Sequence, residues 1–219
     1  WLMLKHTPEG ADEVIMAAQN AGRADAFRLS ALLGVLMGVF CFTLPHTPPA
    51  KNAKQANATS EALGEVQRQP LLVLFLLAVP ISCIHQFYFV FTADFLSHYG
   101  RDAAMTINKI FGVGGGGLMT IGQMSEILVL AGIPLLAGKL SRKTLLGIGI
   151  AAYATRMALF AYTDSLATVL LGVGLHGLCF GCFIFVAFMV VDEHTTSDVR
   201  ASAQNLFNLV IVGIGIIVG

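Results

Sequence analysis

Charge is scarce in this chain of 219 residues. Only 12% of the residues are Asp, Glu, Lys or Arg, whereas a soluble domain carries about 25%, so there is too little charge to cover a water-facing surface. Lys and Arg balance Asp and Glu at 13 each, which gives no reason to expect a nucleic-acid partner. Hydrophobic residues make up 56% of the chain, and the mean hydropathy is +0.75. These values predict an integral membrane protein.

The sequence also lacks the motifs of several catalytic and ATP-driven classes. It contains no Walker loop, no nucleophile elbow and no zinc-binding motif, so we expect neither an enzyme nor a cofactor. The cysteines all lie inside apolar runs, which favours buried, reduced thiols over disulfides or metal ligands. They are Cys41, Cys83, Cys179 and Cys182.

Long apolar runs dominate the rest of the chain. A helix needs roughly 20 apolar residues to cross the hydrocarbon core of a bilayer. Six runs are of this kind, at about 29–45, 71–96, 114–138, 144–163, 166–191 and 205–219, the last one cut off. They are too continuously apolar for barrel strands, which alternate over about ten residues. The predicted fold class is therefore all-α, a polytopic bundle of transmembrane helices.

Residues 46–70 interrupt this pattern with prolines, lysines and a polar stretch. We interpret them as a solvated linker that joins the end of one half of a larger protein, residues 1–45 with one transmembrane helix, to a truncated second bundle, residues 71–219. The chain starts at Trp1 and ends inside an apolar run, so we expect it to be the interior of a longer protein. The loops after the first, third and fifth spans are the richer in Lys and Arg, which predicts a cytoplasmic linker.

A few polar side chains lie deep inside the apolar runs, where an ionisable group is costly unless it has a partner or faces water. Gln123 and Glu126 are three residues apart and share one helix face, where they offer hydrogen bonds to a polar solute or a proton relay. The alternative is an interhelical pair that only stabilises the bundle. Gln86 lies beside the aromatic residues 87–89, a combination that suits a flat heterocycle and ordinary helix packing equally well.

Two histidines and an arginine also fall within the predicted spans. His85 points about 100° away from the neighbouring glutamine on a helix and is interpreted as structural. His176 is a candidate proton carrier, although a lone histidine is more often a packing residue. Arg156 and Glu126 each lie 15 residues from Ser141, the centre of the turn between their antiparallel helices. We therefore expect them at similar depth, where they would pair directly or through water.

Four short motifs occur in a fixed order along the chain. They are FTLPHTPPAK (42–51), GQMSE (122–126), RMALFAYTD (156–164) and VRASAQNLF (199–207). In order and spacing they resemble the nucleoside–proton symporter family of the major facilitator superfamily, at the end of its sixth helix, in its eighth and ninth helices and at the start of its eleventh. The resemblance covers nearly the whole chain and implies part of a major-facilitator fold, about helices six to eleven.

The same resemblance implies a secondary active transporter that moves nucleosides across the cell inner membrane by proton symport. The expected partners are the nucleoside, protons and the lipid bilayer, and the expected oligomeric state is a monomer. Two alternatives stay open. One is a major-facilitator transporter for another polar solute such as a sugar, and the other is a receptor-like membrane protein that binds without transporting.

The resemblance assigns substrate binding to four positions: Gln86, Gln123, Glu126 and Phe180. It also makes the Glu126–Arg156 pair a candidate for ion pairing or proton coupling. Two positions depart from the family, because Phe89 stands where Asn is expected and Gly181 stands where Asp is expected. The sequence therefore leaves the preferred nucleoside and the route of the proton open.

Overall fold

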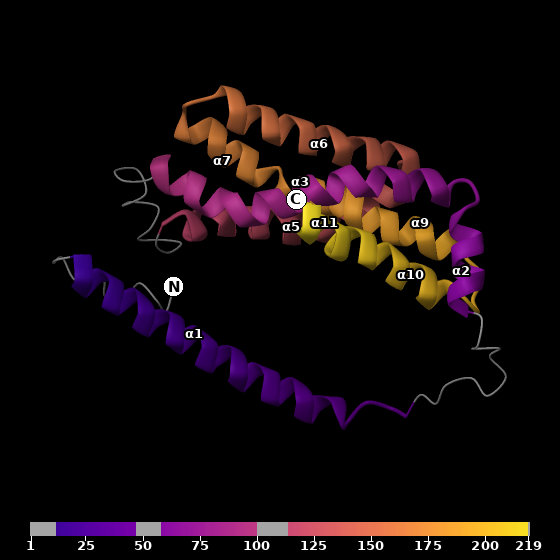
Figure 1. The fold of residues 1–219 in the computed structure, drawn as a ribbon, viewed down its shortest axis with the longest axis horizontal. Coiled ribbons are helices and arrows are strands. Elements are labelled where there is room, and N and C mark those ends of the chain that lie inside the picture. Colours follow the sequence, from indigo (N-terminus) through magenta and orange to yellow (C-terminus); the bar gives the residue numbers. More distant parts are fainter. Residues whose placement is uncertain (1–11, 47–57, 100–113, 219) are drawn as a thin grey trace.

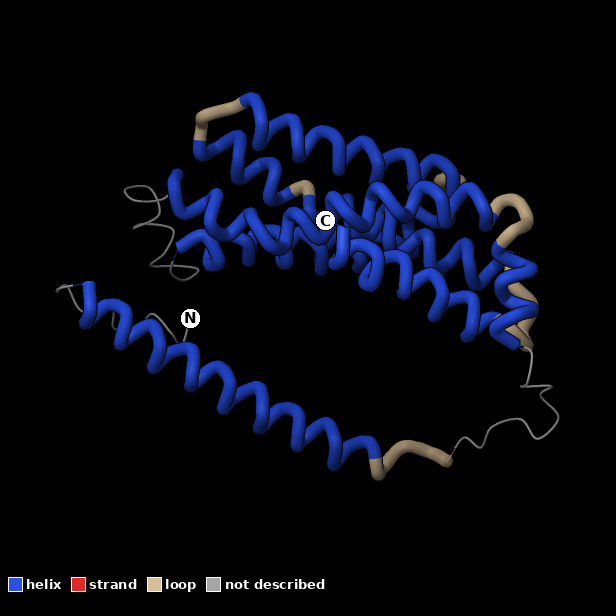
Figure 2. Tube along the Cα trace, in the orientation of Figure 1, coloured by secondary structure: helices blue, strands red, loops and turns tan. Residues whose placement is uncertain are grey.

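The computed structural model describes residues 12–46, 58–99 and 114–218. Its longer helices are α1 (Asp12–Cys41), α3 (Leu71–Tyr99), α5 (Gly114–Ala137) and α6 (Arg142–Tyr162). Its shorter elements are α2 (Ala58–Val66), α7 (Leu166–Gly174), α8 (His176–Leu178), η2 (Cys179–Phe185), α9 (Val186–His194), α10 (Arg200–Asn208), η3 (Leu209–Ile214) and α11 (Gly215–Val218). In these residues every regular element is a helix (Figures 1 and 2).

Six stretches of the described residues are long and apolar enough to cross a membrane. They are Ala24–Cys41, Leu71–Ser97, Gly117–Ala137, Arg142–Tyr162, Leu166–His194 and Arg200–Val218. The fifth joins α7, α8, η2 and α9, and the sixth joins α10, η3 and α11. The all-α bundle of transmembrane helices predicted from the sequence is therefore confirmed.

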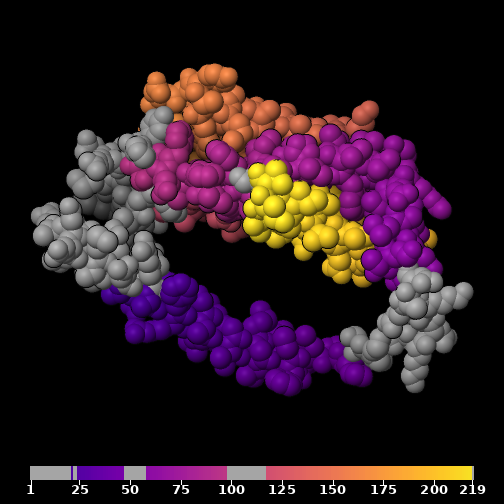
Figure 3. All heavy atoms as spheres, in the orientation of Figure 1, coloured from indigo at the N-terminus to yellow at the C-terminus, as the bar shows by residue number. Residues whose placement is uncertain are grey.

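Five of the six spans pack into one bundle, and α1 lies apart from it (Figures 1 and 3). None of Ala24–Cys41 is buried. Within the bundle α3 contacts α5, η3 and α11, and α6 contacts η2 and α7. The apolar side chains of α1 are thus left without a protein partner among the described residues.

The segment interpreted as a solvated linker contains a helix that the sequence did not predict. In α2, Ala62 and Val66 are buried in the core of the bundle. The carboxylate of Glu65 accepts hydrogen bonds from the backbone N–H of Thr196 at 3.1 Å and from its hydroxyl at 2.9 Å. The second part of the linker therefore packs on one end of the bundle, while residues 47–57 lie outside the described part. The division into two halves stays a prediction.

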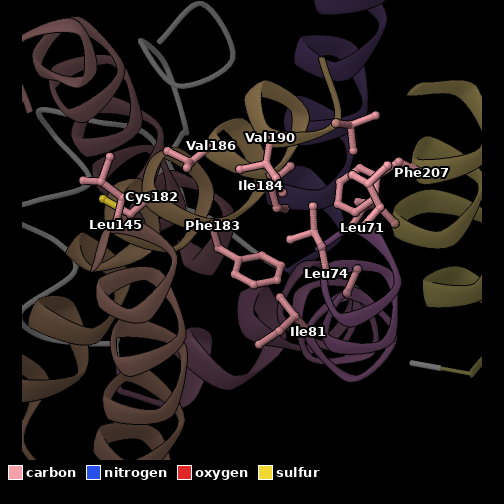
Figure 4. Packing of buried hydrophobic residues seen from close by; sticks show 14 of the residues in the cluster. Leu71, Leu74, Ile81, Leu145, Cys182, Phe183, Ile184, Val186, Val190 and Phe207 are labelled. Carbon is pink, nitrogen blue, oxygen red and sulfur yellow. The ribbon is translucent and has the colours of Figure 1, made fainter. Parts of the chain in front are cut away.

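The apolar core consists of two clusters separated along the bundle. The larger gathers the start of α3, most of α6, η2, α9 and α10, with residues such as Leu71, Phe183 and Phe207 fully buried (Figure 4). The smaller, at the other end, contains Leu96, Leu118, Val169 and Val173. Because lipid is as apolar as leucine, close van der Waals packing holds such helices together.

The turn between α5 and α6 is fixed by polar contacts at its end of the bundle. The Ser141 hydroxyl accepts a hydrogen bond from the backbone N–H of Thr144 at 3.1 Å and caps α6. Arg142 forms an ion pair with Glu193 of α9, with Nη2 and Oε1 2.7 Å apart. Together with the Glu65 contacts, these bonds join α2, α6 and α9 at one end of the molecule.

The close approach of α6 to η2 depends on Gly149. A Cβ at this position would lie 2.7 Å from the backbone nitrogen and Cβ of Phe183, whereas a Cβ at Gly147 would meet nothing within 4 Å. We expect Gly149→Ala to overpack this crossing at a cost of about 1–3 kcal/mol. The thermal midpoint of the full-length protein in detergent should fall by about 5 °C. Gly147→Ala is the matched control, and equal midpoints for both variants would contradict this packing.

Candidate functional site

A layer of polar and aromatic side chains lies between the two apolar clusters. The midpoints of four spans fall at about residues 84, 127, 152 and 180, and His85, Glu126, Arg156 and His176 each lie within four residues of one of them. Polar groups at this depth mark solute or ion sites in many membrane proteins because their cost must be met by partners or water. We call this set, with Tyr88 and Tyr153, the polar layer.

The GQMSE motif of α5 brings the polar layer together by letting α8 approach closely. A Cβ on Gly177 would overlap the carbonyl of Ser125, and one on Gly122 would lie 3.1 Å from the Cβ of His176. The Ser125 hydroxyl accepts a hydrogen bond from the Gly177 N–H at 2.9 Å. Two glycines and one hydroxyl therefore set the α5–α8 distance that Glu126 and His176 need in order to meet.

The fifth span is not a regular α-helix where it passes the site. α7 ends at Gly174, α8 holds three residues, and η2 from Cys179 to Phe185 is π-helical. Such irregularities inside helices occur frequently at functional sites. They also change the direction of the side chains that follow, so the face occupied by His176 and Phe180 does not follow from helical periodicity.

Arg156 is the most deeply buried charge of the site, with no exposed surface. Its guanidinium carbon lies 4.0 Å from the ring centroid of Tyr88 and 4.9 Å from that of Tyr153, and cation–π contacts of this kind are worth about 2 kcal/mol when desolvated. Its Nη1 lies 3.2 Å from Nδ1 of His176. Within the described part of the chain, Nε and Nη2 have no hydrogen-bond partner.

His176 lies between Arg156 and Glu126. Its Nε2 is 3.3 Å from Oε2 of Glu126, within ion-pair distance but outside hydrogen-bond geometry. The side chain of Glu126 is 19% exposed and that of His176 is fully buried. In the described residues no ion pair joins Glu126 to Arg156 directly. His176 contacts both of them and so lies between the two charges that the sequence analysis expected to pair. Functional coupling of Glu126 and Arg156 stays a prediction.

Aromatic rings hold His176 in place. Its ring stacks on Tyr88, with centroids 5.0 Å apart, and on His85, with centroids 5.8 Å apart. His85 is fixed in turn by a 2.8 Å hydrogen bond between its Nδ1 and the Tyr153 hydroxyl. This arrangement agrees with the structural role that the sequence gave to His85.

The four predicted substrate residues lie at different distances from the polar layer. Glu126 is part of the layer and contacts His176, and the ring of half-buried Phe180 lies 6.3 Å from that of His85. Gln86 is half-buried against Gly215 of α11, and Gln123 is exposed on α5. Their convergence on one cavity stays a prediction.

Gly181 occupies the position where the family resemblance predicts an Asp. A Cβ on Gly181 would lie 2.7 Å from Cγ1 of Val129 and 3.8 Å from Cδ1 of Ile133. The position is buried against apolar side chains of α5, so in this chain it is a close helix contact. Glu126 is the carboxylate nearest mid-depth among the described spans.

Sequence reasoning named Tyr88 only as one of the aromatic residues beside Gln86, and it missed Tyr153 and Ser125 as contributors to the site. One signal was available for Tyr153, because residues three apart on a helix are neighbours and Tyr153 precedes Arg156 by three positions. Tyr88 and Ser125 act across helices, and nothing in a single sequence shows which helices touch.

Comparison with known proteins gives a consistent result. The family model described as "Nucleoside H+ symporter" matches residues 15–219. Nucleoside permease NupG of Escherichia coli (strain K12) is 28% identical over 199 residues, which cover 87% of this chain and 47% of NupG. Xanthosine permease of the same organism is 26% identical over 196 residues, which cover 84% of this chain and 46% of the permease.

The crystal structure of nucleoside transporter NupG has a similar fold, with a TM-score of 0.60 at 24% identity over 87% of this chain and 49% of NupG. The expected part of a major-facilitator fold is thereby confirmed. The chain spans about half the length of the curated relatives that it matches.

The hydroxyl of Tyr153 supports the site through His85. We expect Tyr153→Phe to keep the aromatic face under Arg156 but to leave Nδ1 of His85 without its partner, at a cost of about 1–3 kcal/mol. The thermal midpoint of the full-length protein in detergent should fall accordingly. Tyr162→Phe removes a hydroxyl from a residue that is 87% exposed and serves as the control. A midpoint for Tyr153→Phe equal to that of the control would show that the bond contributes nothing.

Proposed function

The chain belongs to the nucleoside H+ symporter family, and from this membership we propose that the full-length protein is a secondary active transporter that moves nucleosides across the cell inner membrane by proton symport. The observation that carries the proposal is the polar layer at mid-depth, where a partly exposed carboxylate meets a buried His–Arg pair. Transporters of this kind bind their solutes near the bilayer midplane between two halves. A central water-filled cavity would also remove most of the cost of placing Glu126 at this depth.

We assign the solute contacts to Gln86, Gln123, Glu126 and Phe180. A nucleoside carries hydroxyl and N–H donors, carbonyl and ring-nitrogen acceptors, and a flat heterocycle. A carboxylate accepts hydrogen bonds, an amide both donates and accepts them, and a phenyl ring stacks on a base. The exposed position of Gln123 on α5 supports this assignment, because a side chain that contacts a solute must not be covered by the rest of the bundle.

The family membership supports a transporter and not an enzyme, and we propose that the protein works as a monomer without a cofactor. The polar layer holds no metal-like cluster within the described residues. One relative is named for nucleosides in general, and the other is named for a single nucleoside, xanthosine. We therefore propose the nucleoside class and leave the preferred member to experiment.

We propose further that α2, the Gly138–Lys143 turn and the Thr196 loop face the cytoplasm. The Arg142–Glu193 and Glu65–Thr196 contacts join these segments at one end of the bundle (Figure 1). The basic residues of this end include Arg68, Lys139, Arg142, Lys143 and Arg200. An excess of Lys and Arg in short loops is typical of the cytoplasmic side.

Uptake by the full-length protein in proteoliposomes tests the function. Labelled uridine or adenosine should accumulate, and an inward proton gradient should increase the accumulation. We expect Glu126→Gln to lower kcat/KM about 10- to 100-fold, because a hydrogen bond to a charged group contributes about 1.5–3 kcal/mol and each factor of ten corresponds to about 1.4 kcal/mol.

Glu61→Gln, at an exposed carboxylate on α2, is the matched control and should retain wild-type uptake. Normal uptake by Glu126→Gln would remove this residue from the solute site. Accumulation of a sugar without accumulation of any nucleoside would favour the alternative transporter, and solute binding without accumulation would favour the receptor.

Cysteine labelling tests the orientation. Lys139 is chosen as the labelling position in the Gly138–Lys143 turn, because replacing Ser141 in the same turn would remove the side chain that caps α6. In a cysteine-free background, Lys139→Cys should react with a membrane-impermeant maleimide only when the reagent reaches the cytoplasmic face. Ser165→Cys lies in the exposed turn at the other end of α6 and should show the opposite pattern. Labelling of Lys139→Cys in intact cells would invert the proposed topology.

A further inference from the structure

We propose that His176 is a positioning residue that Arg156 holds in one tautomer, so that its Nε2–H is directed at Glu126 and orients this carboxylate for the solute. The proposal concerns a residue outside the assigned substrate positions. The uptake experiment that tests it rests on the proposed function, whereas chemical labelling of Glu126 does not.

The tautomer follows from the chemistry of the two nitrogens. A guanidinium has donors and no acceptor, so in the 3.2 Å contact between Arg156 Nη1 and His176 Nδ1 the imidazole nitrogen must accept. A neutral imidazole carries its proton on the other nitrogen. Nε2 therefore bears the hydrogen, and Nε2 is the atom that lies 3.3 Å from Oε2 of Glu126.

Arg156 is able to fix the histidine because it is fixed itself. It has no exposed surface, and the rings of Tyr88 and Tyr153 lie within 5 Å of its guanidinium carbon. A cation enclosed in this way loses these ring contacts if it turns its Nη1 away from His176. The two tyrosines thus fix Arg156, Arg156 fixes the tautomer of His176, and His176 orients Glu126.

The other groups around His176 do not compete for its Nε2–H. Tyr88 and His85 stack on the imidazole ring, and Phe89 meets it edge-on with centroids 5.5 Å apart. Glu126 is the carboxylate within ion-pair distance of the ring in the described residues.

With Oε2 facing His176, Oε1 of Glu126 is left for the solute. The side chain is 19% exposed, so the carboxylate has both a buried partner and an open side. The Nε2–Oε2 contact is within ion-pair distance but outside hydrogen-bond geometry in the structure, and we expect it to tighten when the solute binds, as catalytic hydrogen bonds do. His176 thereby acts through Glu126 without touching the solute.

Three variants of the full-length protein separate positioning from packing. In His176→Gln, the amide oxygen is able to accept from Arg156 while the amide N–H donates to Glu126, so this variant reproduces both contacts. His176→Phe keeps a ring for the aromatic stack and removes both contacts. His194→Phe is the control, because His194 is a histidine outside the polar layer, at the end of α9, where its Nδ1 lies 3.0 Å from the Val190 carbonyl oxygen.

In nucleoside uptake, normalised to folded protein, we expect His176→Phe to raise KM about tenfold, as the loss of a hydrogen bond to a charged group implies. His176→Gln should restore KM to within about threefold of wild type, and His194→Phe should leave KM within the same range. An unchanged KM in His176→Phe, a failure of His176→Gln to restore KM, or an equal rise in His194→Phe would each overturn the proposal.

A substrate-independent readout keeps the inference testable if the wild-type protein transports no nucleoside, an outcome that would defeat the proposed function alone. A hydrophobic carbodiimide reacts with protonated carboxyl groups, and mass spectrometry follows its attachment to Glu126. Loss of the Nε2–H donor should make Glu126 easier to protonate, so its labelling rate should rise severalfold in His176→Phe, and neither in His176→Gln nor in His194→Phe. Equal labelling in all variants would overturn the positioning role.

Discussion

The structure depends on the accommodation of one guanidinium at the centre of an apolar bundle. A buried charge costs several kcal/mol unless polar or aromatic groups replace its hydration. Around Arg156 this replacement comes from the faces of two tyrosines and one imidazole nitrogen, supplied by three different spans. The positions of α3, α6 and α8 relative to one another are therefore set by a single cation as much as by the apolar clusters on either side of it.

This constraint explains why small residues gather where they do. The close contacts of Gly122 and Gly177 lie between α5 and α8, next to the layer that contains Arg156. Gly149 and Gly181 permit equally close approaches within the larger apolar cluster. Small residues are the usual means of bringing membrane helices together, and here they also bring polar groups within bonding distance. The same close backbone contacts therefore pack the helices and bring Glu126 and His176 near each other.

Much of the fold could be predicted from the sequence because a membrane span is defined by length and hydropathy, and both are visible in one chain. The described spans begin and end within a few residues of the predicted runs, with the largest differences at the starts of the first and the last. α2 was missed because its nine residues are too few to cross a bilayer and lie within a stretch rich in polar and charged residues. Its helix is stabilised by Ala62 and Val66 packing on the bundle and by the contact of Glu65 with Thr196.

The site was less predictable than the fold. Glu126 and Arg156 were found because ionisable residues are conspicuous in apolar runs, and their similar depth followed from the length of the hairpin. The direction of each side chain did not follow, because a helix that is apolar on all sides gives no periodic signal for its buried face. The π-helical turn of η2 shifts the register of the fifth span further. His176 was therefore read either as a proton carrier or as a packing residue, and its contacts with both Glu126 and Arg156 were not predicted.

The α5–α8 crossing sets a limit on how this bundle can move. Overlap at Gly177 prevents the two helices from coming closer, and the bond from the Gly177 N–H to Ser125 opposes their separation. These contacts favour movement of the two helices as a unit. In the transport cycle proposed above, the distance between Glu126 and His176 would then stay nearly constant, while the distance from Glu126 to the opposite half would change. The carboxylate and its buried partner would move together, so the same acid would be available to the solute from either side of the membrane.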